Sequence, residues 1–111
     1  MFVAVWRFVA KPGRVAEFEQ AYGPDGHWAQ LFRQGIGYEG TTVLCSETKD
    51  SYLLADHWLS RADFENFKKH FRAEYETLDK RCDELTVEET HLGYFEPLES
   101  TEKSVATGGP R

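Results

Sequence analysis

Residues 2–9 read FVAVWRFV, an apolar run that only Arg7 interrupts. The run is too short for a typical helix and is rich in β-branched and aromatic residues, so it predicts a strand that is buried on both faces. Successive side chains of a strand point to opposite faces, and both faces of the sheet therefore need a cover. One face carries Phe2, Ala4, Trp6 and Phe8, and the other carries Val3, Val5 and Val9.

Shorter patterns follow this strand. Apolar residues at helical spacing predict an amphipathic helix over 15–22 and a short helical segment over 28–32. Strands are predicted over 38–45 and 52–58, with a polar hairpin loop between them, and a last strand over 85–95. Alternation along the last strand places Leu85, Val87, Glu89, His91, Gly93 and Phe95 on one face.

The longest periodic pattern starts at Ser60. Ser60 and Asp63 form the Ser-x-x-acid signal that starts a helix. Large apolar residues then recur at helical spacing as far as Cys82, which predicts one long amphipathic helix. These residues are Phe64, Phe67, Phe71, Tyr75, Leu78 and Cys82.

The order β-α-β-β-α-β predicts an α+β fold of the ferredoxin-like type, with a four-stranded antiparallel sheet and the helices on one face. The domain is expected over 1–98, and residues 99–111, rich in Ser, Thr, Glu, Lys and Gly, are expected to form a disordered tail. Because helices of one chain cover only one face, we expect a homodimer that packs sheet against sheet through Val3, Val5 and Val43.

Composition excludes several classes of protein. Lys and Arg number 13 against 19 Asp and Glu, which gives a net charge of −6. This sign disfavours binding to nucleic acid or to anionic membranes. The sequence shows neither an apolar run of about 20 residues nor a signal peptide at its start, so a cytoplasmic protein is expected. Cys45 and Cys82 fit no metal or redox motif and are expected to be reduced, mostly buried thiols.

Four short motifs point to a known family. They are Lys11-Pro12-Gly13 after the first strand, Glu17-Phe18-Glu19 in the next helix, Gly35-Ile36-Gly37-Tyr38, and the stretch DHWLSRADF over 56–64. Together they resemble the antibiotic-biosynthesis monooxygenase family of dimeric α+β barrels, over about residues 1–95. The resemblance implies the fold and the dimer, whereas the chemistry of this superfamily varies from member to member.

The resemblance implies a cofactor-independent monooxygenase that acts on a small aromatic or quinol-type metabolite. In such members the substrate anion itself reduces dioxygen, and the protein supplies an apolar pocket, hydrogen bonds and a group that handles the proton. A non-catalytic dimeric protein that binds a small apolar or aromatic molecule is the alternative, and isomerisation also stays open.

Haem degradation is a further alternative within the superfamily. That branch carries Asn, Trp and His at positions that align with Trp6, Phe67 and Tyr75, and all three depart from the pattern. His70, one turn from Phe67, is the one histidine placed to substitute as an axial ligand of haem iron.

Aromatic side chains are the candidates for a binding pocket, although any one of them more often belongs to a core than to a ligand site. Tyr75 and His70 are the candidate catalytic residues. The Tyr75 phenol offers a hydrogen bond to a substrate oxygen, and His70, with an ordinary pKa near 6.5, suits a proton acceptor at the pocket mouth. The candidate substrate-binding residues are Trp6, Trp28, Trp58, Phe67 and Phe71.

The other groups of polar residues in the sequence predict no metal, cofactor or catalytic site. No histidine pair or His-carboxylate cluster has the spacing of metal ligands, so neither a metal nor a cofactor is expected. Asp56 and His57 are neighbours on a strand and point to opposite faces, as do Glu88 and Glu89. Gly35-Ile36-Gly37 lacks the third glycine and the helix of a dinucleotide site.

Overall fold

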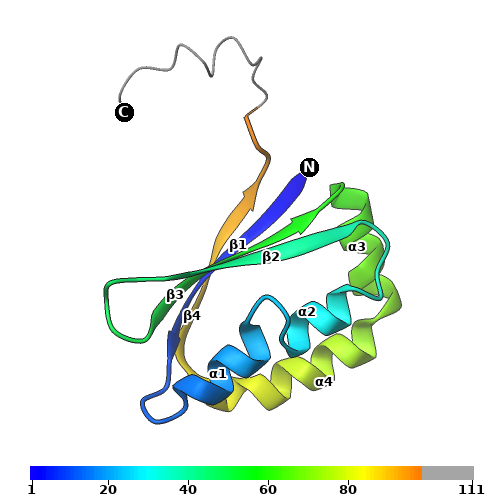
Figure 1. Cartoon of the computed structure of the whole chain (residues 1–111). Coiled ribbons are helices and arrows are strands. Elements are labelled where there is room, and N and C mark those ends of the chain that lie inside the picture. The colour runs from blue at the N-terminus through cyan, green and yellow to red at the C-terminus, as the bar shows by residue number, and fades with distance from the viewer. Residues whose placement is uncertain (99–111) are drawn as a thin grey trace, which may run out of the picture.

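A computed structural model describes residues 1–98 of the chain. Its element order is the predicted one, except that two helices replace the predicted long helix after Ser60 and a 3₁₀ turn at Asp83–Leu85 precedes the last strand (Figure 1). The tail expected over 99–111 lies outside the described residues. The strands are β1 (Phe2–Ala10), β2 (Tyr38–Cys45), β3 (Ser51–Trp58) and β4 (Thr86–Phe95), and the helices are α1 (Val15–Tyr22), α2 (His27–Phe32), α3 (Arg61–His70) and α4 (Arg72–Cys82).

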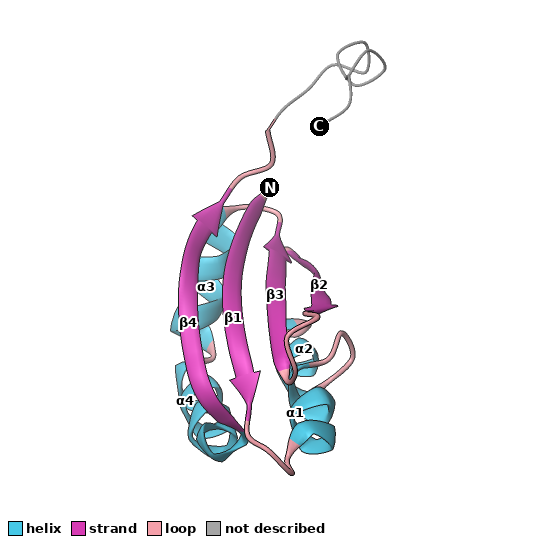
Figure 2. Cartoon of the chain, turned by 90° about the vertical axis from the view of Figure 1, so that its left-hand side faces the viewer, coloured by secondary structure: helices cyan, strands magenta, loops and turns pink. Residues whose placement is uncertain are grey.

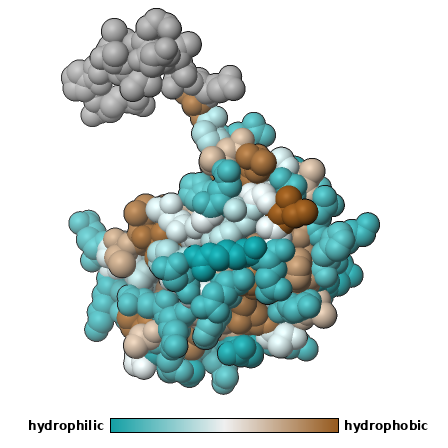
Figure 3. Space-filling view, turned by 45° about the vertical axis from the view of Figure 1, so that its right-hand side comes forward, coloured by the Kyte–Doolittle hydropathy of each residue, from teal (hydrophilic) through white to brown (hydrophobic). Residues whose placement is uncertain are grey.

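The four strands form one antiparallel sheet in the order β2-β3-β1-β4, so the ferredoxin-like prediction is confirmed. Figure 2 shows the sheet toward the viewer with the helices behind it, and no helix of the described residues covers the near face. The side that carries the helices is mostly hydrophilic on its outside, with apolar side chains visible in places (Figure 3).

Rings fill the space between the sheet and the helices. Trp58 at the end of β3 and Phe18 in α1 are 0% exposed. The Trp58 ring lies 5.2 to 5.7 Å from the rings of Phe32, Phe64 and Phe67, centroid to centroid. Aromatic pairs at such distances add stability beyond the area that they bury. The aromatic pattern of the sequence is therefore first of all a core.

The predicted long helix after Ser60 is two helices. Ser60 caps α3 as expected, since its side chain accepts a hydrogen bond from the Asp63 backbone N–H at 3.1 Å. Phe71 then leaves helical geometry, with φ −112° and ψ 30°, and separates α3 from α4. Its N–H still donates to Phe67 O, and its carbonyl accepts from the Tyr75 N–H. The backbone bonds thus continue across the break, which no Pro or Gly announces.

At three points the strand pairing is irregular, and the residues beyond these points lie on other faces of the sheet than predicted. Pairing slips at Glu39 in β2, and at Val87 and Leu92 in β4. An extra residue in one strand reverses the alternation beyond it. Val43 therefore pairs with Leu54 on the helix-covered face instead of facing outward. Along β4, Glu89 and His91 face the helices, whereas Gly93 and Phe95 lie on the open face.

The glycines of Gly35-Ile36-Gly37 have a packing role. Gly37 has φ +91°, which favours glycine, and a Cβ atom there would lie 2.3 Å from Oδ2 of Asp63. A Cβ atom on Gly35 would lie 2.8 Å from Cδ1 of Phe67. Both glycines let α3 approach the chain that enters β2.

The open face of the sheet is largely apolar. Val3 and Val5 lie on it, and Leu44 and Phe95 are 53% and 51% exposed. Arg7 on this face forms an ion pair with Glu88. No helix within residues 1–98 is long and apolar enough to cross a membrane.

The two cysteines differ in exposure. Cys82 is buried, whereas Cys45 is exposed, so the expectation of two mostly buried thiols is wrong for Cys45. Cys45 is the last residue of β2, which is an edge strand of the sheet. Both are free thiols.

Candidate functional site

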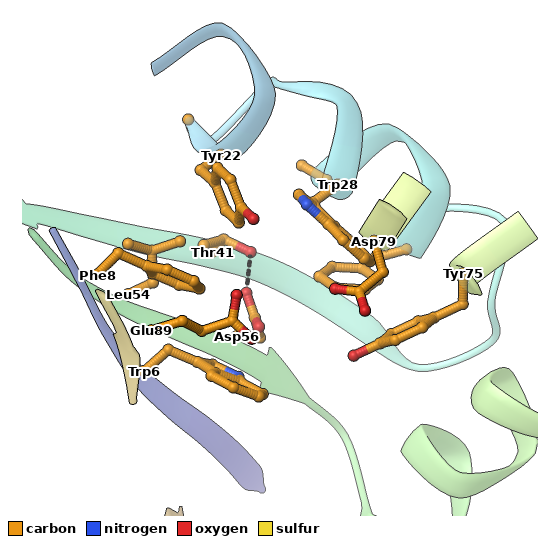
Figure 4. A pocket seen from close by; sticks show the side chains of 13 residues that line it. Trp6, Phe8, Tyr22, Trp28, Thr41, Leu54, Asp56, Tyr75, Asp79 and Glu89 are labelled. Carbon is orange, nitrogen blue, oxygen red and sulfur yellow. Dashed lines mark hydrogen bonds between the residues drawn. The ribbon is translucent and has the colours of Figure 1, made fainter. Parts of the chain in front are cut away.

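A cavity of about 50 Å³ lies between the helix-covered face of the sheet and helices α1, α2 and α4 (Figure 4). That volume holds a few water molecules. Its aromatic lining comes from Trp6, Phe8, Tyr22, Trp28, Phe32 and Tyr75. Its polar lining comes from Thr41, Asp56, Asp79 and Glu89.

Strand pairing brings the polar groups together. Thr41 of β2 pairs with Asp56 of β3, so both side chains project from the same face of adjacent strands. Glu89 of β4 pairs with Phe8 of β1 on that face. Asp79 enters from α4 on the opposite side of the cavity (Figure 4).

Asp56 is the most buried of these carboxyl groups, with 8% of the residue exposed. Thr41 Oγ1 donates a hydrogen bond to Asp56 Oδ1 at 2.8 Å, and Thr41 Oγ1 lies 2.6 Å from Tyr38 Oη. Because the Thr41 proton goes to Asp56, Tyr38 is the donor to Thr41. Burial raises the pKa of Asp56 to about 6, and the Thr41 bond lowers it in part. Asp56 therefore exchanges a proton near neutral pH.

Asp79 and Glu89 make one end of the cavity acidic. Burial is the main cause that raises the pKa of Asp79, and the nearby Asp83 charge adds to it. Burial also raises the pKa of Glu89, with Asp79 and Asp83 contributing. Mutual repulsion and desolvation thus both favour protonated carboxyl groups here.

Two aromatic residues supply hydrogen-bond donors. The Tyr75 hydroxyl points into the cavity (Figure 4), and burial raises its pKa to about 12, so it stays protonated at neutral pH. The Tyr75 ring meets Trp28 edge to face at 4.9 Å between centroids. The indole N–H of Trp28 is buried and forms no hydrogen bond within residues 1–98. It lies near the Tyr22 hydroxyl and the Cys82 thiol, and its proximity lowers both of their pKa values, which burial raises.

The residues singled out from the sequence divide into two groups. Trp6, Trp28 and Tyr75 line the cavity. Trp58 and Phe67 belong to the closed core, and Phe71 stacks on Phe67 at 5.3 Å. His70 is exposed, with Nδ1 at 3.0 Å from the Asn66 carbonyl oxygen, and it is not part of the cavity lining.

Sequence reasoning missed the four polar residues of the cavity. Asp56 and His57 point to opposite faces of β3, as strand alternation predicts. His57 lies on the open face, with Nε2 3.0 Å from Thr42 Oγ1. The overlooked signal was the position of Asp56 in β3. Asp56 is the one charged residue among alternate positions that are otherwise buried and apolar or aromatic, namely Tyr52, Leu54 and Trp58.

The residues present do not fit an iron porphyrin. None of the chain's four histidines lines the cavity, so it offers no imidazole ligand for haem iron. Among residues 1–98, no group of three or more His, Cys, Asp or Glu side chains is arranged to hold a metal ion.

Comparison with solved structures finds the same fold in proteins of low sequence identity. SnoaB of Streptomyces nogalater, a cofactor-independent oxygenase, matches with a TM-score of 0.72 and 23% identity, over 89% of this chain and 94% of its own. A candidate antibiotic-biosynthesis monooxygenase of Nitrosomonas europaea matches with a TM-score of 0.68 and 19% identity, over 89% and 100% of the two chains.

A mutant of MhuD, solved with two manganese protoporphyrin IX molecules per active site, matches with a TM-score of 0.66 and 19% identity, over 91% and 98%. No family model matches the chain, and no curated protein matches it significantly. The fold of this chain is that of the antibiotic-biosynthesis monooxygenases, as its sequence motifs predicted.

Proposed function

We propose that the protein is a cofactor-independent monooxygenase that acts on a small aromatic or quinol-type compound. The observation that carries the proposal is the buried Asp56 carboxyl group, whose pKa of about 6 suits a general base, in a cavity lined by rings. The shared fold with the oxygenase SnoaB supports the same reaction class.

The proposed reaction needs only substrate and dioxygen. Asp56 takes the proton of a phenol that has a hydrogen-bearing carbon para to its hydroxyl group. The phenolate gives one electron to dioxygen, and the phenoxyl radical and superoxide then combine into a carbon-bound peroxide. The peroxide takes a proton back from Asp56. Loss of the carbon-bound hydrogen with the outer hydroxide as water leaves a quinone, so one oxygen atom enters the product and the other enters water.

Each lining residue has a part in this chemistry. Thr41, held by Tyr38, fixes the orientation of the Asp56 carboxyl group. The Tyr75 hydroxyl donates a hydrogen bond to the developing phenolate oxygen, which stabilises its charge in an apolar setting. Trp6 and Trp28 contact the faces of the substrate ring and exclude water.

Substrate entry requires the cavity to widen. A volume of about 50 Å³ is smaller than one substituted benzene ring. Trp6 and Tyr75 are only partly buried and line the cavity, so they are the side chains whose rotation admits a ring.

The open sheet face supports a homodimer. Val5 is half-buried on this face and Leu44 and Phe95 are exposed, and no helix of residues 1–98 covers them (Figure 2). A second copy of the chain packed sheet against sheet buries this surface and leaves the cavity on the helix side of each subunit.

The test is oxygen uptake with anthrone, the keto tautomer of 9-anthrol, in buffer without added cofactor. We expect consumption above the autoxidation of the buffer, and we expect Asp56→Asn to lower it by roughly a hundredfold, the size expected of a general base. Glu88→Gln, which alters a carboxyl group on the open face, is the matched control. Tight binding of anthrone without oxygen uptake would instead favour the non-catalytic binding protein.

A further inference from the structure

A second depression adjoins the cavity. It is a groove of about 740 Å³ that runs along α3 and α4 beside Tyr94 of β4. Tyr75 and Asp79 line both the groove and the cavity, so these two side chains form the wall between the two spaces, and rotation of Tyr75 would join them. The groove is within the range of small-molecule sites, whereas the cavity alone is not.

The groove has the opposite charge to the chain as a whole. Its basic residues are Arg61, Lys68, Lys69 and Arg72, and its acidic residues are Glu65, Glu76 and Asp79, which gives four positive against three negative charges. The whole chain carries −6. Glu65 already forms an ion pair within the groove, because its Oε2 atom lies 3.0 Å from Arg61 Nε. Lys68, Lys69 and Arg72 form no ion pair within residues 1–98.

Lys68 joins this charge to the aromatic lining. Its Nζ atom lies 5.3 Å from the centroid of the Tyr75 ring and 5.4 Å from that of Phe64. Arg72 is one turn further along the same side of the helices and also lines the groove. Lys68 thus lies beside Tyr75, which lines both spaces, and Lys69 and Arg72 are further cations of the groove.

We infer that this groove binds the carboxylate of an aromatic acid whose phenolic ring occupies the cavity. The inference rests on the proposed function, which places the phenolic ring of the ligand in the cavity. It adds that the groove binds the carboxylate at the other end of the same ligand. A phenol at Asp56 must be neutral when it arrives, because the cavity itself is acidic, so the anionic group belongs at the far end of the molecule. Basic side chains outnumber acidic ones in the groove, which favours an anionic group there.

The groove stays accessible in the proposed dimer. Its residues come from α3, α4 and the helix-facing Tyr94, whereas the dimer uses the open face with Val3 and Val5. A ligand in the groove therefore competes with no part of the proposed subunit contact.

The experiment compares two probes that differ by one carboxylate, 2-naphthol and 6-hydroxy-2-naphthoate, by titration calorimetry on the full chain. We expect the acid to bind about tenfold more tightly than the naphthol at low salt, and the difference to shrink at high salt. Lys68→Met together with Arg72→Met is expected to remove the difference without changing the affinity for 2-naphthol. Methionine keeps the apolar stem over Tyr75 and Phe64.

Lys80→Met removes the same charge from an exposed site of α4 outside the groove, and it is the control. Equal affinity for both probes in the wild-type protein overturns the inference and leaves the proposed ring site intact. Failure of both probes to bind overturns both. Binding of the acid that depends on Lys68, with no oxygen uptake from anthrone, supports the inference and contradicts the proposed oxygenase reaction.

Discussion

At the scale of single residues, Asp56 is placed for proton transfer at a cost in stability. Its carboxyl group is buried among rings, and within residues 1–98 only Thr41 donates a hydrogen bond to it. A buried ionised carboxylate with so little compensation destabilises the folded state. Carboxyl groups with pKa values raised by burial cluster at functional sites, which agrees with the proposed role of Asp56.

Asp56→Asn is therefore expected to stabilise the protein while it lowers activity. The unfolded carboxyl group ionises near pH 4 and the folded one near pH 6. Protonated Asp56 therefore favours the folded state, and this contribution to the free energy of unfolding is fully present below pH 4 and is lost as the pH rises through 6. At about pH 7.5 the asparagine variant should be more stable by roughly 1 to 3 kcal/mol.

Urea unfolding of both proteins across this pH range checks the expectation. The advantage of the variant should fade toward pH 4, where the wild-type carboxyl group is also neutral. A variant that is less stable at neutral pH would show that Asp56 serves the fold as a charged group.

Thr41→Val is expected to move the pH dependence of turnover. The Thr41 hydroxyl favours ionised Asp56, so its loss raises the pKa of that carboxyl group further. The fall of kcat/KM at acidic pH reports the pKa of Asp56 in the substrate-free enzyme, and it should shift to higher pH by about one unit. A lower rate with an unmoved limb would mean that Thr41 acts on packing alone.

At the scale of elements, the sequence predicted order and type well and local geometry less well. Periodicity identifies each strand and the α3–α4 segment because burial imposes it on the side chains. The break at Phe71 leaves no such imprint, because neither Pro nor Gly occurs there. Two of the three slips do carry a signal, since the glycine after each of them has a positive φ, +114° at Gly40 and +139° at Gly93, and a glycine inside a strand is typical of a bulge. Strict alternation ignores these slips and groups Glu89 with Gly93 and Phe95, which lie on the other face, so it did not predict the acidic end of the cavity.

Ser60→Ala tests the start of α3. Its side chain satisfies the backbone N–H of Asp63, and loss of such a cap costs about 1 kcal/mol. We expect a lower unfolding temperature for Ser60→Ala and little change for Thr77→Ala, which removes an exposed hydroxyl group within α4. Equal effects of the two substitutions would contradict the capping role.

At the scale of the whole molecule, one sheet separates two different surfaces. The cavity and the groove lie on the side that carries the helices, whereas no helix of residues 1–98 covers the other side (Figure 2). The sequence predicted this division from the two apolar faces of β1, because alternation within a strand is a local property.

The dimer prediction follows from the open side. Val5→Lys puts a charge in the middle of the proposed contact, where it has no partner, and we expect sedimentation at micromolar concentration to show monomers. Ala73→Lys adds the same charge on the exposed side of α4 and should leave the dimer intact. A wild-type chain that sediments as a monomer at the same concentration would refute the proposed contact.

Oxygenation without a cofactor in the Asp56 cavity is measured most directly with ¹⁸O₂. Anthrone is incubated under labelled dioxygen with the purified full chain, and the product is analysed by mass spectrometry. We expect anthraquinone with one labelled oxygen atom, formed faster than in buffer by the wild-type protein and at close to the buffer rate by Asp56→Asn. Formation at the buffer rate with the wild-type protein, or equal rates for the wild-type protein and Asp56→Asn, would contradict it.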